Sequence, residues 1–357
     1  MSLLLRRLSR LRLGKPLLVR SSVLLSNGFS SSSLQTPPCS ILYVTPCGAG
    51  LGKLVISNAD EPFIKLEKKV PLELVDSDPM VTIGASHGWV ATLKDDGIVR
   101  LQDDLNPYAS DTDPKRISLP PLVTLPGCQT QVVTNVAMSS SSPEDEDCVV
   151  AVKFLGSQLS FCRPAQANSE WINFRIASPC FYSSPVMFSE KHDMFCIPGS
   201  GGHLIGSWDP RTHKHKPKFQ RLRFQNLPEL TKTKRELLQS CCTSEHLVES
   251  RTTDETFLVK LYRKVTASGT VKMQTKDVMV FKLDEEGNAV YTKDIGDLSI
   301  FISKSEPFCV PASSFPGMVK ILDLEECITF CLPYSYNCGG IRTKRGAPYH
   351  IPPQNIV

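Results

Sequence analysis

The sequence has no apolar run of the roughly 18 to 20 residues that a membrane-spanning helix needs. It also has no uninterrupted apolar stretch near its N-terminus of the kind that directs secretion. Acidic residues are missing from the start of the chain, where Asp60 is the first. These absences predict a soluble protein that is neither inserted into a membrane nor secreted and that begins with a purely basic segment.

Cysteine is plentiful, but its pattern argues against disulfides. The thirteen cysteines are an odd number, they are scattered without a repeated spacing, and no secretory signal precedes them. We expect most of them to be reduced thiols packed as small apolar side chains.

The net charge of +4 belongs to the N-terminal segment. Residues 1–33 contain six basic residues and no acid, which leaves 34 Lys and Arg against 36 Asp and Glu in the rest of the chain. The body of the protein is therefore close to neutral and gives no general argument for nucleic-acid binding.

Residues 1–33 are typical of a mitochondrial import sequence. In a helix, Leu4, Leu8 and Leu11 would share one face, while arginines gather on another. The basic residues of the segment are Arg6, Arg7, Arg10, Arg12, Lys15 and Arg20. We predict a cleavable presequence, cut between Arg20 and Ser33, and a location in the mitochondrial matrix. A chloroplast transit peptide or a disordered basic tail is the alternative.

The rest of the chain predicts short strands separated by turns. At 90–101, two apolar segments flank the turn sequence KDDG, whose Asp-Gly pair favours a tight hairpin. Further hairpins are expected at 149–161, at 194–208 around the sequence PGSGG, and at 278–292. At 256–263, Phe257, Val259 and Leu261 fall on one face of a strand.

One stretch predicts a helix, which Asn226 would cap and which would extend through Ser240. Many short strands with regular turns indicate a sandwich, a barrel or a propeller. Because hairpins recur every few tens of residues, we predict an all-β, propeller-like repeat of short antiparallel hairpins, with one short helix near 228–240.

Two motifs imitate enzyme signatures. The sequence GASHG at 84–88 fits the G-x-S-x-G pattern of serine hydrolases, with Ser86 as the nucleophile, but that motif needs a helix after the serine. A second strand follows instead, so we expect a strand-to-strand corner, with a serine hydrolase as a lesser alternative. The sequence CGAGLGK at 47–53 imitates a phosphate loop but lacks two of its required residues and a following helix. We expect a glycine-rich hairpin turn there.

No metal or cofactor site is predicted. His203, His213 and His215 lie near one another in the sequence, and three cysteines cluster near the C-terminus at Cys327, Cys331 and Cys338. Structural zinc sites pair two half-sites, and these cysteines have no clear second half.

The segment at 211–235 predicts a possible contact with RNA. It carries nine basic residues and one acid, with Phe219 and Phe224 among them. Phosphate contacts combined with aromatic stacking are what binding of single-stranded RNA requires. The candidate contacts are Lys214, Lys216, Lys218, Arg221 and Arg223. A solvated loop and helix face is the alternative.

Several phrases together resemble one family. They are SHGWVATL at 86–93, ISLPPL at 117–122, NLPELTKTKRELLQSCCTSEHLVES at 226–250, TFLVKLYRK at 256–264, VMVFKLDEE at 278–286, IGDLSIFIS at 295–303 and FCVPASSFPG at 308–317. In this order they look like the plant F-box-associated domain of unknown function described as a KIB-type β-propeller. Typical members place an F-box ahead of this domain and act as substrate receptors of ubiquitin ligases. Residues 34–80 show no three-helix F-box pattern, so the chain looks like an organellar branch of the family without the F-box.

The resemblance implies a binding module and supplies no catalytic residues. We therefore expect a presequence at 1–33, a propeller domain at 34–338 and a C-terminal tail at 339–357. The predicted function is a non-enzymatic interaction module in mitochondria with a protein partner, and RNA contact through 211–235 is the alternative.

Overall fold

The computed structural model describes residues 35–58, 60–61, 63–75, 82–129, 132–211, 216–266, 272–315 and 349–354. All of them belong to the unit Gln35–Val357. Four of the sequence predictions lie outside the described residues: the presequence with Arg6, Arg7, Arg10, Arg12 and Arg20; the candidate RNA contact Lys214; the histidines His213 and His215; and the cysteines Cys327, Cys331 and Cys338.

The described strands form six sheets, which we number as blades in chain order. Blade 1 has the order β23-β1-β2-β3 and contains β1 (Cys39–Gly48), β2 (Leu51–Ser57), β3 (Ile64–Pro71) and β23 (His350–Ile351). Blade 2 contains β4 (Thr82–Ser86), β5 (Trp89–Leu93), β6 (Ile98–Gln102) and β7 (Arg116–Pro121). Blade 3 contains β8 (Val133–Met138), β9 (Val150–Phe154), β10 (Gln158–Cys162) and β11 (Ile172–Arg175).

Blades 4 to 6 follow the same plan with one variation. Blade 4 contains β12 (Met187–Ser189), β13 (Met194–Pro198), β14 (Leu204–Trp208) and β15 (Lys218–Arg221). Blade 5 contains β17 (Cys242–Ser250), β18 (Glu255–Thr266), β19 (Lys272–Leu283) and β20 (Asn288–Thr292), and β16 (Arg223–Gln225) adds a parallel strand to its outer edge. The described part of blade 6 contains β21 (Leu298–Phe301) and β22 (Phe308–Pro311).

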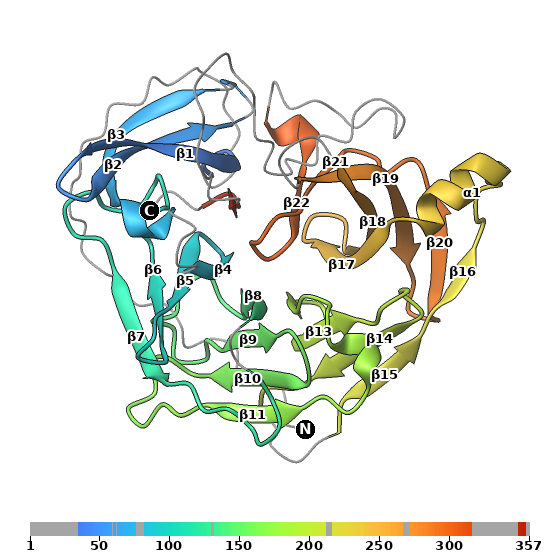
Figure 1. Ribbon diagram of the computed structural model, residues 1–357, viewed down its shortest axis with the longest axis horizontal. Coiled ribbons are helices and arrows are strands. Elements are labelled where there is room, and N and C mark those ends of the chain that lie inside the picture. Colours follow the sequence, from blue (N-terminus) through green and yellow to red (C-terminus); the bar gives the residue numbers. More distant parts are fainter. Residues whose placement is uncertain are drawn as a thin grey trace, which may run out of the picture. The chain divides into compact units, whose positions relative to one another are not determined.

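The blades surround a common centre, as Figure 1 shows. The strands β4, β8, β12 and β17 contact one another in turn, and β17 contacts β22. Antiparallel sheets set radially around a centre are the β-propeller architecture. The predicted fold class, an all-β repeat of short antiparallel hairpins, is confirmed.

The core lies between neighbouring blades. Each of five apolar clusters fills the space between two consecutive blades, so the sheets of blades 2 to 5 are buried on both faces. This explains why strands such as β9 and β10 are apolar or buried along their whole length and do not alternate strictly. The predicted face of Phe257, Val259 and Leu261 is confirmed, because all three lie in the cluster between blades 5 and 6.

The predicted hairpins are confirmed at β5–β6, β9–β10, β13–β14 and β19–β20. In the first, Gly97 has a φ of 72°, which the tight turn requires and which glycine adopts without strain. The Asp96 carboxylate accepts a hydrogen bond from the backbone N–H of Ile98 at 2.9 Å and closes the same turn.

The C-terminal residues close the ring, so the prediction of a tail at 339–357 is wrong for residues 349–354. Strand β23 pairs antiparallel with β1, and the carbonyl of Tyr349 accepts a hydrogen bond from the N–H of Ile41 at 3.0 Å. Tyr349 and Ile351 are 1% and 0% exposed. The sequence prediction failed because a two-residue strand among prolines has no periodicity of its own.

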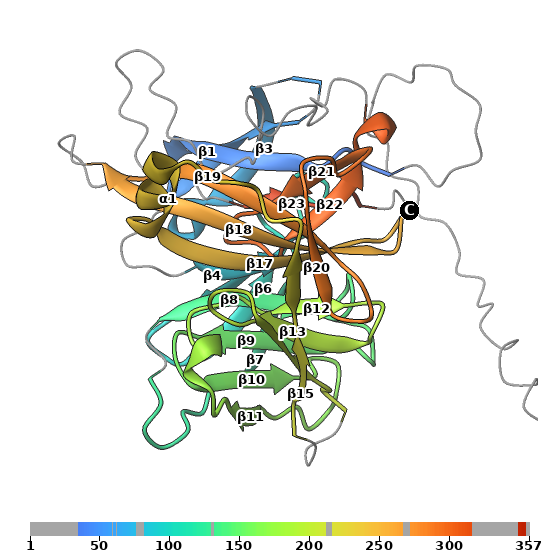
Figure 2. The ribbon, with the colours of Figure 1, turned by 90° about the vertical axis from the view of Figure 1, so that its right-hand side faces the viewer.

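The helix is shorter than predicted. The helix α1 (Lys232–Gln239) begins after Thr231, whose hydroxyl accepts a hydrogen bond from the N–H of Lys234 and caps it. Asn226 has a φ of 54°, which turns the chain before the helix instead of starting it. Figure 2 shows α1 beside β18 and β19, and Lys234 and Asp277 of β19 form an ion pair at 3.3 Å. In the described part of the chain, no helix has the length and apolar character to cross a membrane.

Candidate functional site

Ion pairs join the loops at one end of the blades. Lys191 of the β12–β13 turn reaches Asp254 of the β17–β18 turn at 3.4 Å and Glu285 of the β19–β20 turn at 3.2 Å. On the neighbouring blades, Lys115 of the β6–β7 loop pairs with Glu144 of the β8–β9 loop. These contacts place the turns of several blades on one rim.

The same rim includes two further contacts. Arg211 of the β14–β15 loop binds Asp193 of the β12–β13 turn at 2.6 Å. Trp89, at the start of β5, donates its indole N–H to the carbonyl of Ser141 in the β8–β9 loop at 3.1 Å. The loop at 139–147, which the sequence marks as acidic, is therefore part of this rim.

This end of the ring is strongly acidic. The described residues of the six loops at 103–115, 139–149, 190–193, 209–217, 251–254 and 284–287 include 15 acidic and five basic residues. This end is therefore acidic, although the chain as a whole has 36 acidic and 40 basic residues. We call these six loops the acidic end, and the loops at the other ends of the strands the opposite end.

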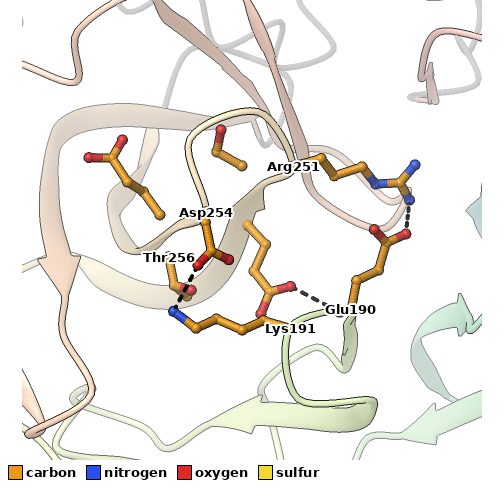
Figure 3. A pocket seen from close by; sticks show the side chains of 8 residues that line it. Glu190, Lys191, Arg251, Asp254 and Thr256 are labelled. Atoms are coloured by element: carbon orange, nitrogen blue, oxygen red, sulfur yellow. Dashed lines mark hydrogen bonds and ion pairs between the residues drawn. The ribbon is translucent and has the colours of Figure 1, made fainter. Parts of the chain in front are cut away.

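A small cavity opens between blades 4 and 5 at the acidic end. It has a volume of about 130 Å³ and is lined by the β12–β13 turn and the β17–β18 hairpin. Figure 3 shows its two cations, each held by a carboxylate: Arg251 by Glu190 at 2.6 Å, and Lys191 by Asp254. Four acidic and two basic side chains line the cavity, so its lining is net negative.

A loop from blade 6 reaches the centre of the acidic end. Residues 302–307 connect β21 and β22, and Figure 1 shows this loop directed toward the middle of the ring. We call it the central tip. Ser305 forms a parallel bridge with Ala85 of β4, and the N–H of Glu306 donates to the Ala85 carbonyl at 2.7 Å.

The carboxylate of Glu306 joins three blades. It accepts hydrogen bonds from the hydroxyl of Ser86 at 2.5 Å, from the N–H of Phe188 at 2.6 Å and from the N–H of Met138 at 3.3 Å. These donors belong to β4, β12 and β8, respectively. One side chain therefore connects the inner strands of blades 2, 3 and 4 with blade 6.

Burial dominates the electrostatics at this centre. It raises the pKa of Glu306 to about 7, although the bonds from Ser86, Phe188 and Met138 and the charge of Arg251 favour the ionised form. Burial and the same arginine lower the pKa of the neighbouring His87 to about 4. Burial therefore favours the neutral form of both groups.

The two motifs that imitate enzyme signatures lie in hairpin turns, as expected. Ser86 ends β4, a two-residue turn follows, and β5 begins at Trp89, so the strand-to-helix elbow of a hydrolase is replaced by a strand-to-strand corner. Ser86 is 3% exposed and donates its hydroxyl to Glu306. The sequence CGAGLGK forms the β1–β2 turn, in which Gly48, Ala49 and Gly50 all have positive φ.

The candidate RNA contacts do not form one continuous surface. Lys218 and Arg221 are exposed on β15, the outer strand of blade 4. They point to opposite faces of the strand, because they are three positions apart and side chains alternate along a strand. Arg223 lies on β16 in blade 5 and donates to the carbonyl of Glu286 at 2.7 Å. Lys216 is exposed in the loop that precedes β15.

The aromatic residues of this segment take different roles. Phe219 is 58% exposed and stacks on the buried Phe181 with ring centroids 5.7 Å apart. Phe224 is half-buried against Phe281, and the ammonium of Lys260 lies 4.3 Å from its ring centroid. His203 contacts Phe224 edge-on, and no group of three potential metal ligands occurs among the described residues.

The sequence interpretation missed Glu306 and the acidic end. Glu306 is a single acid between two short apolar strands, which from sequence resembles any solvated turn residue. The acids of the rim come from six loops that are far apart in the chain, and only the register of the blades brings them together. The acidic run at 144–147 was the one local signal.

Two solved structures match this chain at a low TM-score: crystal structures of BBS1N in complex with ARL6DN, soaked with mercury and with lead. They are 10% and 12% identical, cover 72% of this chain and 91% and 92% of their own chains, and both have a TM-score of 0.27. A search of curated proteins finds no significant match. The profile of the KIB1-4 beta-propeller domain matches residues 56–331, about three quarters of the chain, and the protein belongs to this family.

Proposed function

We propose that the protein is a non-enzymatic interaction module whose protein partner docks through a basic surface on the acidic end. The observation that carries this proposal is the excess of 15 acidic over five basic residues among the described residues of six loops at one end of the ring. Ion pairs join these loops into one group on blades 2 and 3 and another on blades 4 and 5. A charged rim of this kind attracts a complementary surface, accelerates its association and suppresses wrong partners. Propellers commonly present such loop surfaces for binding, and the fold by itself carries no chemistry.

The experiment is a crosslinked pull-down of the tagged mature domain from purified mitochondria, with and without nuclease. Glu146 and Asp147 are exposed in the β8–β9 loop, and their side chains make no hydrogen bond or ion pair within the described part of the chain. The double variant Glu146→Lys, Asp147→Lys should lose the partner. The matched control, Asp95→Lys with Glu229→Lys, makes the same charge change with exposed residues of the opposite end and should retain it.

Two results would contradict the proposal. One is equal capture of the partner by both double variants. The other is an interaction that does not weaken when the ionic strength is raised, because exposed charges are screened within about 10 Å at 0.1 M salt.

The location and the missing F-box form part of the same proposal. A mitochondrial address through the basic residues of 1–33 would separate the protein from the ubiquitin ligases that typical family members serve. A reporter fused to residues 1–40 should enter mitochondria, whereas a variant with Arg6, Arg7 and Arg10 changed to Gln should not. A reporter that remains in the cytosol, or enters chloroplasts, would refute this address.

RNA contact is the second candidate, and exposed Phe219, on the same face of β15 as Arg221, favours it. An exposed ring beside a positive charge suits single-stranded RNA. Replacing Lys214, Lys216, Lys218, Arg221 and Arg223 by Gln should weaken binding of a single-stranded RNA oligonucleotide and flatten its salt dependence. Unchanged affinity would remove this candidate, as would partners that survive nuclease in the pull-down.

A further inference from the structure

Three polar side chains on one face of blade 5 have buried atoms without a hydrogen-bond partner. The atoms are the Nε of Arg263, the Oγ1 of Thr275 and the Nδ1 of His246. Arg263 of β18 and Thr275 of β19 are direct partners in the antiparallel pairing, so their side chains point to the same face. Leu261, two residues before Arg263, lies in the cluster between blades 5 and 6, so this face is the one toward blade 6.

His246 of β17 belongs to the same face. Its direct partner on β18 is Val259, which lies in the same cluster between blades 5 and 6. The Nε2 atom of His246 is 3.1 Å from the hydroxyl oxygen of Ser244. When that hydroxyl donates to Nε2, the proton of the neutral ring is on Nδ1, and the unpartnered atom is a donor. Burial, together with the charge of Arg263, lowers the pKa of His246 to about 3, so the ring is neutral and the guanidinium is close enough to act on it.

The charge of Arg263 has no counter-ion among the described residues. Its guanidinium makes no hydrogen bond or ion pair with them, and burial lowers its pKa with no carboxylate to oppose the shift. The acid of β19, Asp277, is opposite Tyr262, which packs in the cluster between blades 4 and 5, and it pairs there with Lys234 at 3.3 Å. A partly buried charge without a partner destabilises the fold, because it has lost hydration and gained nothing in return.

We propose that Arg263, Thr275 and His246 form a binding site for one small oxyanion, a carboxylate or a phosphate. The N–H fork of a guanidinium matches two oxygens of such a group, and a hydroxyl and an imidazole N–H add two neutral donors. Arg263 and Thr275 are only partly buried, so an ion can reach them from solvent. The site shares no residue with the acidic end and is independent of the partner that docks there.

An ion that binds only the folded state stabilises it by mass action. Once the site is saturated, each tenfold increase in free anion should raise the folding equilibrium constant tenfold. Phosphate also stabilises folded proteins in general, because it is excluded from their surface. That general effect does not depend on Arg263, so the difference between the wild type and an Arg263 variant reports the site alone.

The test is urea unfolding of the full-length chain at pH 7. Sodium chloride is replaced stepwise, at constant ionic strength, by sodium phosphate in one series and by sodium acetate in another. In at least one series, the unfolding midpoint of the wild type should rise relative to that of Arg263→Gln as the anion concentration increases. A response to phosphate alone assigns the site to phosphate, and a response to acetate alone assigns it to carboxylate. The control Arg235→Gln makes the same charge change at an exposed position of α1 and should match the wild type.

Equal midpoint shifts for the wild type and Arg263→Gln in both series would overturn the proposal. If Arg263→Gln does not fold, Thr275→Val provides the second test, because it removes one donor and leaves the charge. The anion concentration that half-saturates the site should then be about tenfold higher than in the wild type, the effect of losing one hydrogen bond to a charged group. An unchanged half-saturating concentration would also overturn the proposal.

Discussion

Strand β23 should decide the stability of the whole ring, although it is two residues long. Ile351 is 0% exposed and packs in the cluster between blades 1 and 2 with Cys39, Ile41 and Tyr349. The substitution Ile351→Ala removes three carbon atoms, which at about 0.8 kcal/mol each is about 2.4 kcal/mol of lost burial. The cavity left behind adds to this, so we expect a total cost of about 3 to 4 kcal/mol.

Urea unfolding, followed by fluorescence of the three tryptophans, measures this cost. The unfolding midpoint should fall while the slope stays unchanged, because the same surface is exposed on unfolding. Val123→Ala is the control, since Val123 is 58% exposed and its loss should change the free energy of unfolding by less than about 0.5 kcal/mol. If Ile351→Ala costs no more than Val123→Ala, the C-terminal strand does not close the ring.

Three further predictions concern single positions. Lys153 is 0% exposed and donates to the carbonyls of Tyr182 at 2.9 Å and Gly156 at 3.2 Å. Burial lowers its pKa to about 7. The cost of burying the charged ammonium is therefore present in full below pH 7, and the free energy of unfolding increases as pH rises from 7 toward 10. Thermal or urea unfolding should therefore show wild type gaining on Lys153→Met by up to about 1.4 kcal/mol per pH unit between pH 7 and pH 10, and parallel curves would contradict this. Gly202→Ala should destabilise the fold by more than about 1 kcal/mol and by more than the control Gly97→Ala. Both glycines have positive φ, but only at Gly202 would an added Cβ lie 2.8 Å from the Lys260 side chain. Equal costs for the two variants would show that backbone strain is the whole effect. Thr231→Ala should cost about 1 kcal/mol of local stability in α1, seen as faster amide exchange across the helix, and unchanged exchange would show that the cap contributes nothing.

Neighbouring residues are sufficient to predict the hairpin, which is the repeating unit of the fold. Turn sequences such as KDDG and the apolar runs beside them predicted hairpins that the structure contains, because a tight turn and its flanking strands are specified within about a dozen residues. The helix was predicted in the right place with the wrong start. Asn226 and Thr231 are both good caps by residue type, and only the backbone conformation at Asn226 decides between them.

Residues that are neighbours in the chain are sufficient to predict the strand-and-turn pattern, the all-β class, the family resemblance and the strand-to-strand corner at Ser86. The tertiary structure decided which residues meet across the ring: Ile351 with Cys39, Glu306 with Ser86, and the rim of acids from six loops. Such contacts join positions up to 318 residues apart, as between Thr36 and Gln354. The closure of the blades around one centre determines which of these residues meet, and no pattern of neighbouring residues predicts that closure.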